Sequence, residues 1–283
     1  MARGESPRDS SFRSLHPQAG TRPAVDGGRI VLLGTGGFLN YEREQTCLAL
    51  PLAGEETLLI DTTSGPVVLR QLQRARIPLE SMRHVLVTHQ HPDHAGGLPY
   101  LLVARKVWGG EPPLSIYATA ETTRALQGTL DLVLPGWQTF TEQVRWRELT
   151  PGTPLEIGDL TATPFEVQHT VPCVGVRLAQ GGSTAVFTAD TRPCPNVVEY
   201  ARDAALLIHE VASLDSDAAS AHVQGHATAA DAGRAAREAG ARRLLLTHLP
   251  PSRVADPAAL AKEARSIFRR PVGLARDLLT VEF

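Results

Sequence analysis

The densest chemistry in the sequence lies at residues 88–94, Thr88-His89-Gln90-His91-Pro92-Asp93-His94, where four potential metal ligands fall within six residues. This stretch, the metal loop, follows a hydrophobic run at residues 84–88 that predicts a buried strand. If the strand continued, His89 and His91 would point the same way while Asp93 and His94 diverged, so the ligands can converge only from a loop. An ordinary polar surface loop does not explain this density of histidine and aspartate, which zinc sites require. The stretch therefore predicts a loop that can serve two neighbouring metal ions.

Segments with strand and helix patterns interleave on both sides of the metal loop from Gly28 onward. Apolar, β-favouring runs predict strands at residues 30–33, 47–52, 57–61, 84–88, 114–117, 144–149, 160–167, 175–178, 185–188, 206–209 and 243–247. Helices are predicted at residues 67–76, 98–105, 120–132, 228–239 and 257–267, the fourth of them beginning at a Thr228 cap and ending at Gly240. No regular βαβ period runs through the chain, and several early strands follow each other directly. The pattern favours a mixed, layered α/β fold over a barrel.

Composition limits the classes of protein that fit. The chain has 283 residues with 42% hydrophobic and 20% charged residues, typical of a globular protein, and we expect one large domain at residues 28–283. Residues 1–27 are polar and turn-forming, and we expect a disordered N-terminal tail. With 28 Lys and Arg against 30 Asp and Glu, the net charge of −2 gives no electrostatic case for binding nucleic acid or a membrane.

Two absences and the cysteine count predict the compartment. The sequence has no run of about 18 apolar residues and no short apolar core of a signal peptide near its N-terminus. Cys47, Cys173 and Cys194 are an odd number at wide spacing, which is neither a disulfide framework nor a metal-binding CxxC motif. We therefore expect a cytoplasmic protein with free thiols.

The pattern His89-x-His91-x-Asp93-His94 resembles the signature of the metallo-β-lactamase superfamily of binuclear metallohydrolases. The resemblance implies a single-domain, four-layer αββα sandwich with three later ligands in the order His, Asp, His. His169, Asp190 and His248 occur in that order, each after a predicted strand. The resemblance extends from about residue 28 to the C-terminus.

Carried over by position, the superfamily's ligands form two sets. They are His89, His91 and His169 for one metal, Asp93, His94 and His248 for the other, and Asp190 as the bridge. Imidazole and carboxylate ligands suit Zn²⁺ best, with Mn²⁺ and Fe²⁺ as alternatives. Two cations ~3.5–4 Å apart lower the pKa of a bridging water, which becomes the attacking hydroxide, and polarise the substrate. Asp61, at the end of a predicted strand, resembles the superfamily's aspartate that orients the metal loop; a plain turn aspartate is the alternative.

Three further segments narrow the resemblance to the tRNase Z branch and its phosphodiesterase relatives: Thr188-Ala189-Asp190-Thr191-Arg192-Pro193, His209-Glu210-Val211-Ala212 and Gly225-His226-Ala227-Thr228. In that branch a glutamate and a histidine, here Glu210 and His226, form a pair that serves the leaving group. A carboxylate orients the imidazole and favours its protonated form. The resemblance thus implies Asp93, Glu210 and His226 as catalytic residues, and a surface histidine near a helix cap is the alternative for His226.

Other reactive side chains carry no motif. His209 alternates to the strand face opposite Glu210 and is expected to be structural, as is His84. His222 is expected to be exposed to solvent. Cys173 is expected to be a small buried hydrophobe without a role.

The sequence departs from the tRNA-processing members. Only twenty residues separate His169 from Asp190, so the long arm that grips tRNA in many bacterial forms has no room there. A slightly negative chain also lacks the basic face from which a tRNA binder profits. We expect a small-molecule or nucleotide phosphodiester as substrate, with tRNA binding disfavoured and no membrane contact; homodimerisation is implied by the resemblance alone.

Three alternatives stay open at this point. The chain could hydrolyse a lactone, a thioester or a sulfate ester on the same fold. It could be a mononuclear iron dioxygenase that binds one iron through His89, His91, His169 and Asp190. A binding protein without catalysis is disfavoured, because complete ligand sets cost stability and are seldom kept without metal.

Overall fold

The computed structural model describes residues 27–108, 113–139 and 143–283. Apart from Gly27, the expected N-terminal tail lies outside these residues. None of the helices in the described ranges is long and apolar enough to cross a membrane.

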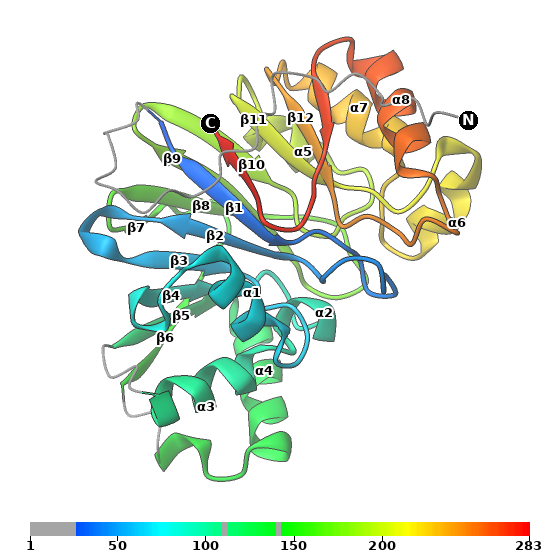
Figure 1. Cartoon of the computed structure of the whole chain (residues 1–283). Coiled ribbons are helices and arrows are strands. Elements are labelled where there is room, and N and C mark those ends of the chain that lie inside the picture. Colours follow the sequence, from blue (N-terminus) through cyan, green and yellow to red (C-terminus); the bar gives the residue numbers. More distant parts are fainter. Residues whose placement is uncertain (1–26, 109–112, 140–142) are drawn as a thin grey trace, which may run out of the picture.

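The first sheet has seven strands among the described residues, in the order β14-β1-β2-β3-β4-β5-β6 (Figure 1). Their bounds are β1 (Arg29–Gly34), β2 (Cys47–Pro51), β3 (Thr57–Ile60), β4 (Met82–Leu86), β5 (Leu114–Ala118), β6 (Val144–Glu148) and β14 (Leu279–Glu282). Strands β3 to β6 pair in parallel, whereas β14, β1, β2 and β3 pair antiparallel. The last strand of the chain, drawn in red, therefore lies beside the first, drawn in blue.

The second sheet also has seven strands in the described part of the chain, in the order β13-β12-β11-β10-β9-β8-β7. They are β7 (Leu155–Ile157), β8 (Leu160–Glu166), β9 (Val174–Gln180), β10 (Ser183–Phe187), β11 (Leu206–Glu210), β12 (Leu244–Thr247) and β13 (Val272–Leu274). Strands β10 to β13 pair in parallel and β7 to β10 antiparallel. The hairpin of β9 and β10 fills most of the segment between His169 and Asp190, which leaves no inserted arm there.

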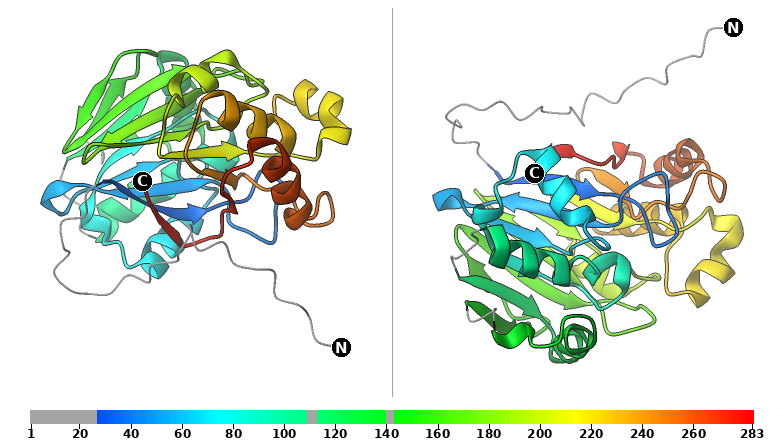
Figure 2. Two further views of the ribbon diagram at one scale, coloured as in Figure 1. Left: turned by 90° about the horizontal axis from the view of Figure 1, so that it is seen from above. Right: turned by 60° about the horizontal axis from the view of Figure 1, so that its bottom comes forward.

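Helices lie on the outer face of each sheet (Figures 1 and 2). On the first sheet they are α1 (Val67–Ala75), α2 (Pro92–Ala95), α3 (Leu98–Trp108) and α4 (Ala120–Val133); on the second they are α5 (Pro195–Tyr200), α7 (Ala229–Glu238) and α8 (Pro257–Phe268). Helix α6 (Ala218–Val223) stands out beyond the second sheet at one end of the molecule. Single 3₁₀ turns are η1 (Ala53–Glu55), η2 (Leu79–Ser81), η3 (Trp137–Thr139) and η4 (Asp215–Asp217). The order helix, sheet, sheet, helix confirms the predicted four-layer αββα sandwich.

Strands buried on both faces explain why the predicted strands are continuous apolar runs. In β2, Leu48 and Leu50 join the core between the two sheets, while Cys47 and Ala49 join the core under α1 and α3. In β10, Phe187 faces the other sheet and Val186 faces α5 and α7. Because side chains alternate across a strand, each continuous apolar run packs against the core between the sheets on one face and against the helices on the other.

One expectation about the metal loop is wrong in part. The predicted strand at residues 84–88 is β4, which ends at Leu86, and Asp93 and His94 lie on the short helix α2 rather than on an open loop. Pro92 occupies the first helical position, where its fixed φ favours a helix and its missing N–H costs nothing. Although Asp93 and His94 lie on this turn of helix, the ring of His94 lies 4.2 Å from that of His89.

The backbone at Gly97 packs closely against the backbone at Thr62, which gives a first testable prediction. A Cβ at this residue would lie 2.0 Å from the backbone oxygen of Thr62. We expect Gly97→Ala to lower the free energy of unfolding by about 1–3 kcal/mol in urea titrations, because neither backbone can give way easily. Gly128 in α4 is the matched control, since a Cβ there meets no atom within 4 Å; Gly128→Ala should raise stability by up to about 1 kcal/mol. Equal effects of the two substitutions would contradict this account.

Candidate metal centre

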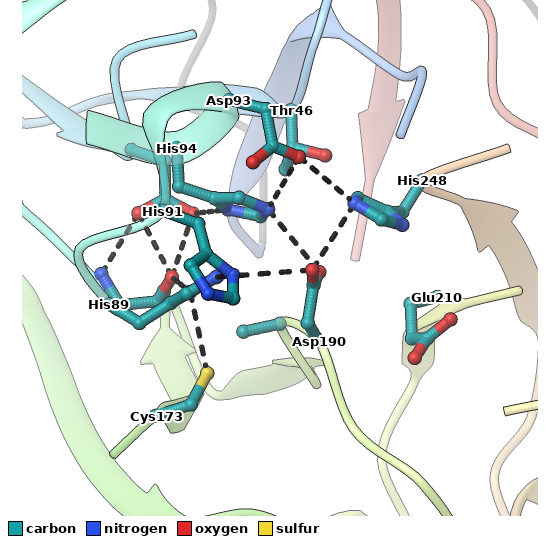
Figure 3. A network of polar contacts seen from close by, with 12 residues as sticks. Thr46, His89, His91, Asp93, His94, Cys173, Asp190, Glu210 and His248 are labelled. Carbon is teal, nitrogen blue, oxygen red and sulfur yellow. Dashed lines mark hydrogen bonds and ion pairs between the residues drawn. The ribbon is translucent and has the colours of Figure 1, made fainter. Parts of the chain in front are cut away.

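The predicted ligands meet at one end of the sandwich because each follows the carboxyl end of a strand. The metal loop follows β4, His169 follows β8, Asp190 follows β10, and His248 follows β12. Within the second sheet β8, β10 and β12 run in the same direction, so their carboxyl ends lie at one edge. Figure 3 shows the metal-loop side chains, Asp190 and His248 pointing toward one another.

Three histidines form the first group. His91 Nδ1 lies 3.2 Å from His89 Nε2 and 3.1 Å from His169 Nε2. The outer nitrogen of His169 donates to the backbone oxygen of Gly225 at 2.9 Å, and that of His89 lies 3.0 Å from Thr88 Oγ1. With their outer nitrogens held by these partners, the inner nitrogens of His89 and His169 both face His91 Nδ1, an arrangement that a cation stabilises.

The second group combines two carboxylates and two histidines. His248 Nε2 lies 3.3 Å from Asp93 Oδ2 and 3.2 Å from Asp190 Oδ2. His94 Nε2 lies 3.4 Å from Asp93 Oδ2 and 3.3 Å from Asp190 Oδ1. Asp190 also lies 3.9 Å from both His89 Nε2 and His169 Nε2, so it stands between the two groups. All members of the second group are buried.

Asp61 holds the metal loop from behind. Its carboxylate is fully buried and accepts hydrogen bonds from the N–H of Thr88 at 2.9 Å and from Thr88 Oγ1 at 3.0 Å. It also accepts one from His94 Nδ1 at 2.8 Å, which leaves His94 Nε2 free to face Asp93 and Asp190. Asp61 is therefore more than a turn aspartate, and the contacts that the resemblance implied are present.

The backbone is strained just after three of the strands that end beside the ligand cluster. Asp61, Ala189 and His248 have φ angles of 63°, 53° and 52° although none is glycine. Such conformations cost about 1–3 kcal/mol each and persist where the surroundings enforce them. The strain aims Asp190 and His248 inward immediately after their strands.

The charge balance of the cluster fits divalent cations. Burial would lower the pKa of His94, but the carboxylates of Asp190, Asp93 and Asp61 raise it well above its ordinary value. Burial alone would raise the pKa of Asp190, yet His248 and His94 hold it well below its ordinary value. His94 Nε2 and Asp190 Oδ1 are buried and lie 3.3 Å apart, and neither makes a well-aligned hydrogen bond among the described residues. Buried carboxylates need compensating positive charge, which a metal ion would supply.

Glu210 and His226 form a pair beside the cluster. Glu210 Oε1 accepts hydrogen bonds from His226 Nδ1 at 3.1 Å and from the N–H groups of Thr191 and Ala227, both at 3.0 Å. The ring of His226 lies 5.3 Å from that of His248 and 5.0 Å from that of His169. Burial would lower the pKa of His226, but the Glu210 carboxylate outweighs burial and raises it to about 9.

Three histidines and one cysteine outside the motifs, His84, His209, His222 and Cys173, differ in their contacts. His84 bonds to Tyr117 and Glu56 away from the cluster, and His209 is buried and donates to the backbone of Glu210, so both are structural as predicted. Cys173 is buried as predicted, but its Sγ lies 3.5 Å from His89 Nδ1, against the metal loop. His222 is partly exposed, with 36% of its side chain accessible, and its Nε2 also lies 2.8 Å from Asp231 Oδ2, a contact that the sequence did not indicate.

Asp231 gives a prediction about acid stability. Burial would raise its pKa, but hydrogen bonds from His222, Thr228 and Arg234 outweigh burial and lower it to about 2. Because the pKa of Asp231 in the folded state lies below the ordinary 3.8, its ionised carboxylate stabilises the folded state above pH ~4 by on the order of 2 kcal/mol. This stabilisation is lost as the pH falls toward 2. We expect Asp231→Asn to unfold more readily at pH 6 in urea and to approach the wild type near pH 2. A difference that is independent of pH would contradict the assignment.

The comparisons with known proteins agree with this geometry. Residues 56–249 match the Beta-lactamase superfamily domain, which is more than half of the chain, and the chain belongs to this superfamily. The probable metallo-hydrolase YhfI of Bacillus subtilis is 33% identical over 254 residues, covering 88% of this chain and 97% of the relative. Ribonuclease Z of Methanosarcina mazei is 28% identical and covers 90% of this chain and 97% of the relative.

Solved structures share the fold over almost the whole chain. The metallo-beta-lactamase fold protein YhfI from Bacillus subtilis matches with a TM-score of 0.78 and 28% identity, over 91% of this chain and 100% of that one. The short form of human tRNase Z matches in fold with a TM-score of 0.71 at 22% identity, over 89% of this chain and 98% of that one. Together with the buried His and Asp cluster, the relatives identify the chain as a metal-dependent hydrolase.

Proposed function

We propose that this chain is a dinuclear zinc phosphodiesterase. The observation that carries the proposal is the pairing of Glu210 with His226 beside a cluster of seven metal-ligand side chains. The two cations are assigned to His89, His91 and His169, and to Asp93, His94 and His248, with Asp190 shared between them. Mn²⁺ and Fe²⁺ suit the same donors and are tested alongside zinc.

The residues of the centre have different roles in the proposed hydrolysis. Bound divalent cations lower the pKa of a water molecule and polarise the phosphoryl group. Asp93 and Asp190 balance that positive charge and orient His248 and His94 through the contacts described above. Glu210 occupies Nδ1 of His226, so the proton that reaches the departing alkoxide is held at Nε2. The Glu210 carboxylate raises the pKa of His226 against the effect of burial and so favours the protonated imidazole that this task requires.

The chain's own features favour a substrate smaller than tRNA. The β9–β10 hairpin leaves no arm between His169 and Asp190, and the net charge of −2 offers no general attraction to RNA. We infer that the substrate is a nucleotide or small-molecule phosphodiester. A cytoplasmic location is proposed because Cys47, Cys173 and Cys194 are all free, as thiols are in a reducing compartment; homodimerisation rests on the resemblance alone.

Metal analysis joined to a substrate panel tests the proposal. We expect two zinc ions per chain, hydrolysis of methyl p-nitrophenyl phosphate, loss of turnover with EDTA and recovery with Zn²⁺. One iron per chain with no hydrolysis would support the dioxygenase alternative. Turnover of a lactone, thioester or sulfate ester with no turnover of any diester would move the chain to another hydrolase branch. Precursor tRNA belongs in the same panel, and we expect it to remain uncleaved.

A further inference from the structure

The segment between β11 and α7, residues 211–228, leaves the sandwich and returns to it at a closed neck. The N–H of Ala212 donates to the oxygen of Ala227 and the N–H of Ala229 to that of Ser213, both at 2.9 Å. Ser213 and Thr228 also form an isolated β-bridge. Between these points the chain forms η4 and α6, which stand out from the body of the molecule (Figure 2). We call residues 211–228 the excursion.

The return leg of the excursion contacts both parts of the candidate centre. The backbone oxygen of Gly225 accepts from His169 Nδ1 at 2.9 Å, and His226 Nδ1 lies 3.1 Å from Glu210 Oε1. The approach at Gly225 is close, because φ is +79° and a Cβ would lie 2.8 Å from His169 Nδ1. A shift of this leg would therefore move His226 and loosen the support of His169 together.

A hydrogen bond from His222 to Asp231 ties the exposed α6 to the start of α7. His222 Nε2 lies 2.8 Å from Asp231 Oδ2, and the N–H of His226 donates to the oxygen of Ala221 at 2.9 Å, one residue before His222. In the described part of the chain, no other side-chain hydrogen bond or ion pair joins α6 to α7. His226 is thus held from two sides, through its side chain by Glu210 and through its backbone by Ala221 of α6.

Asp231 is a firm anchor for this tie. Its side chain is 6% exposed, and it also accepts from the N–H of Thr228 at 3.0 Å, from Thr228 Oγ1 at 2.8 Å and from Arg234 at 2.5 Å. The Thr228 contacts complete a capping box at the start of α7, which alone would fix this helix end. The bond to His222 joins this fixed helix end to α6, beside the contacts of Asp215 with Thr228 and Arg234 that join η4 to α7.

We propose that His222 and Asp231 are positioning residues that hold His226 in reach of the leaving group. The inference rests on the proposed phosphodiesterase activity, in which His226 gives the proton. A loosened excursion would misplace the His226 proton donor, and misplacement of about 1 Å can cost up to 100-fold in rate. Neither residue touches the reacting atoms.

Leaving-group dependence separates positioning from mere stability. The variants are His222→Leu, which lacks the hydrogen bond, and His222→Gln, which keeps an N–H donor. Thr119→Ala is the matched control, because Thr119 caps α4 through the N–H of Thr122 and lies outside the excursion. We expect His222→Leu to lower kcat about 10-fold on methyl phenyl phosphate and less than about 2-fold on methyl p-nitrophenyl phosphate. His222→Gln should restore most of the lost rate, and Thr119→Ala should leave the ratio of the two rates unchanged.

Amide hydrogen exchange supplies a readout that needs no substrate. In His222→Leu, peptides covering residues 218–228 should exchange about 10-fold faster than in wild type, with the metal content unchanged, whereas Thr119→Ala should leave these peptides as they are. Unchanged exchange, or equal rate losses on both esters, would overturn the positioning role. If the wild-type protein hydrolyses no phosphodiester, the proposed function fails first and the positioning of His226 for a leaving group falls with it. Faster exchange would then show only a structural tie.

Discussion

His226→Ala is expected to slow hydrolysis of a phosphodiester with a poor leaving group by roughly 10²–10⁴-fold while the metal content stays the same. The reason is that His226 holds the proton for the departing oxygen and belongs to neither metal group in our assignment. Metal analysis and steady-state kinetics on methyl phenyl phosphate measure the two effects separately.

The size of this loss should depend on the leaving group. p-Nitrophenolate departs without much help from an acid, so the loss should shrink on methyl p-nitrophenyl phosphate. Glu210→Gln should act as a milder version, since it keeps a hydrogen bond to His226 but removes the charge that favours the imidazolium. His84→Gln is the matched control, because His84 bonds to Tyr117 outside the cluster. If His226→Ala kept full activity on methyl phenyl phosphate, His226 would not be the proton donor, and the structure would support a metallohydrolase without supporting phosphodiester chemistry in particular.

His91→Ala should lower metal content and activity together. His91 Nδ1 stands within 3.2 Å of the inner nitrogens of both His89 and His169, so its loss opens the first metal group. Residues that merely orient a ligand cost 10–100-fold in metal affinity or activity when removed, and a ligand itself should cost more than about 100-fold. Zinc per chain and kcat/KM measure the effect.

The control for that substitution is again a histidine outside the cluster. His84→Ala should keep its metal and lose little activity, although it gives up hydrogen bonds to Tyr117 and Glu56. Retention of two metals and of normal turnover by His91→Ala would remove His91 from the ligand set.

Local patterns in the sequence carried most of the site. The metal loop is apparent from residue types alone, because four potential ligands follow an apolar run within six residues. His169, Asp190 and His248 follow from the order of ligands that the superfamily resemblance implies, and each of them follows a predicted strand. The Thr228 cap of α7 also follows from residue types alone, as does the end of this helix at Glu238, just before Gly240 with its φ of +68°. These are the features for which the physical cause lies within a few residues of its effect.

Contacts made through space were not predictable in this way. Cys173 meets His89 across 84 residues of sequence, and His222 meets Asp231 across a reversal of the chain that no periodicity shows. The short elements β7, β13 and α2 have three or four residues each, too few for a period to appear. Pairing of β14 with β1 was equally invisible, since strand partners far apart leave no local mark.

The pairing of β1 with β14 joins two strands that lie far apart in the sequence. Leu32 pairs with Leu279, so β1 lacks its β14 partner until residues 279–282 have been synthesised and have folded back onto it. His89 and His91 emerge long before His248, and during that time they can offer a cation only part of a coordination sphere. Long-range pairing of this kind slows folding and leaves apolar strand edges open meanwhile. Closing of the first sheet by β14 is therefore a late step of folding, and one edge of β1 stays unpaired until that step occurs.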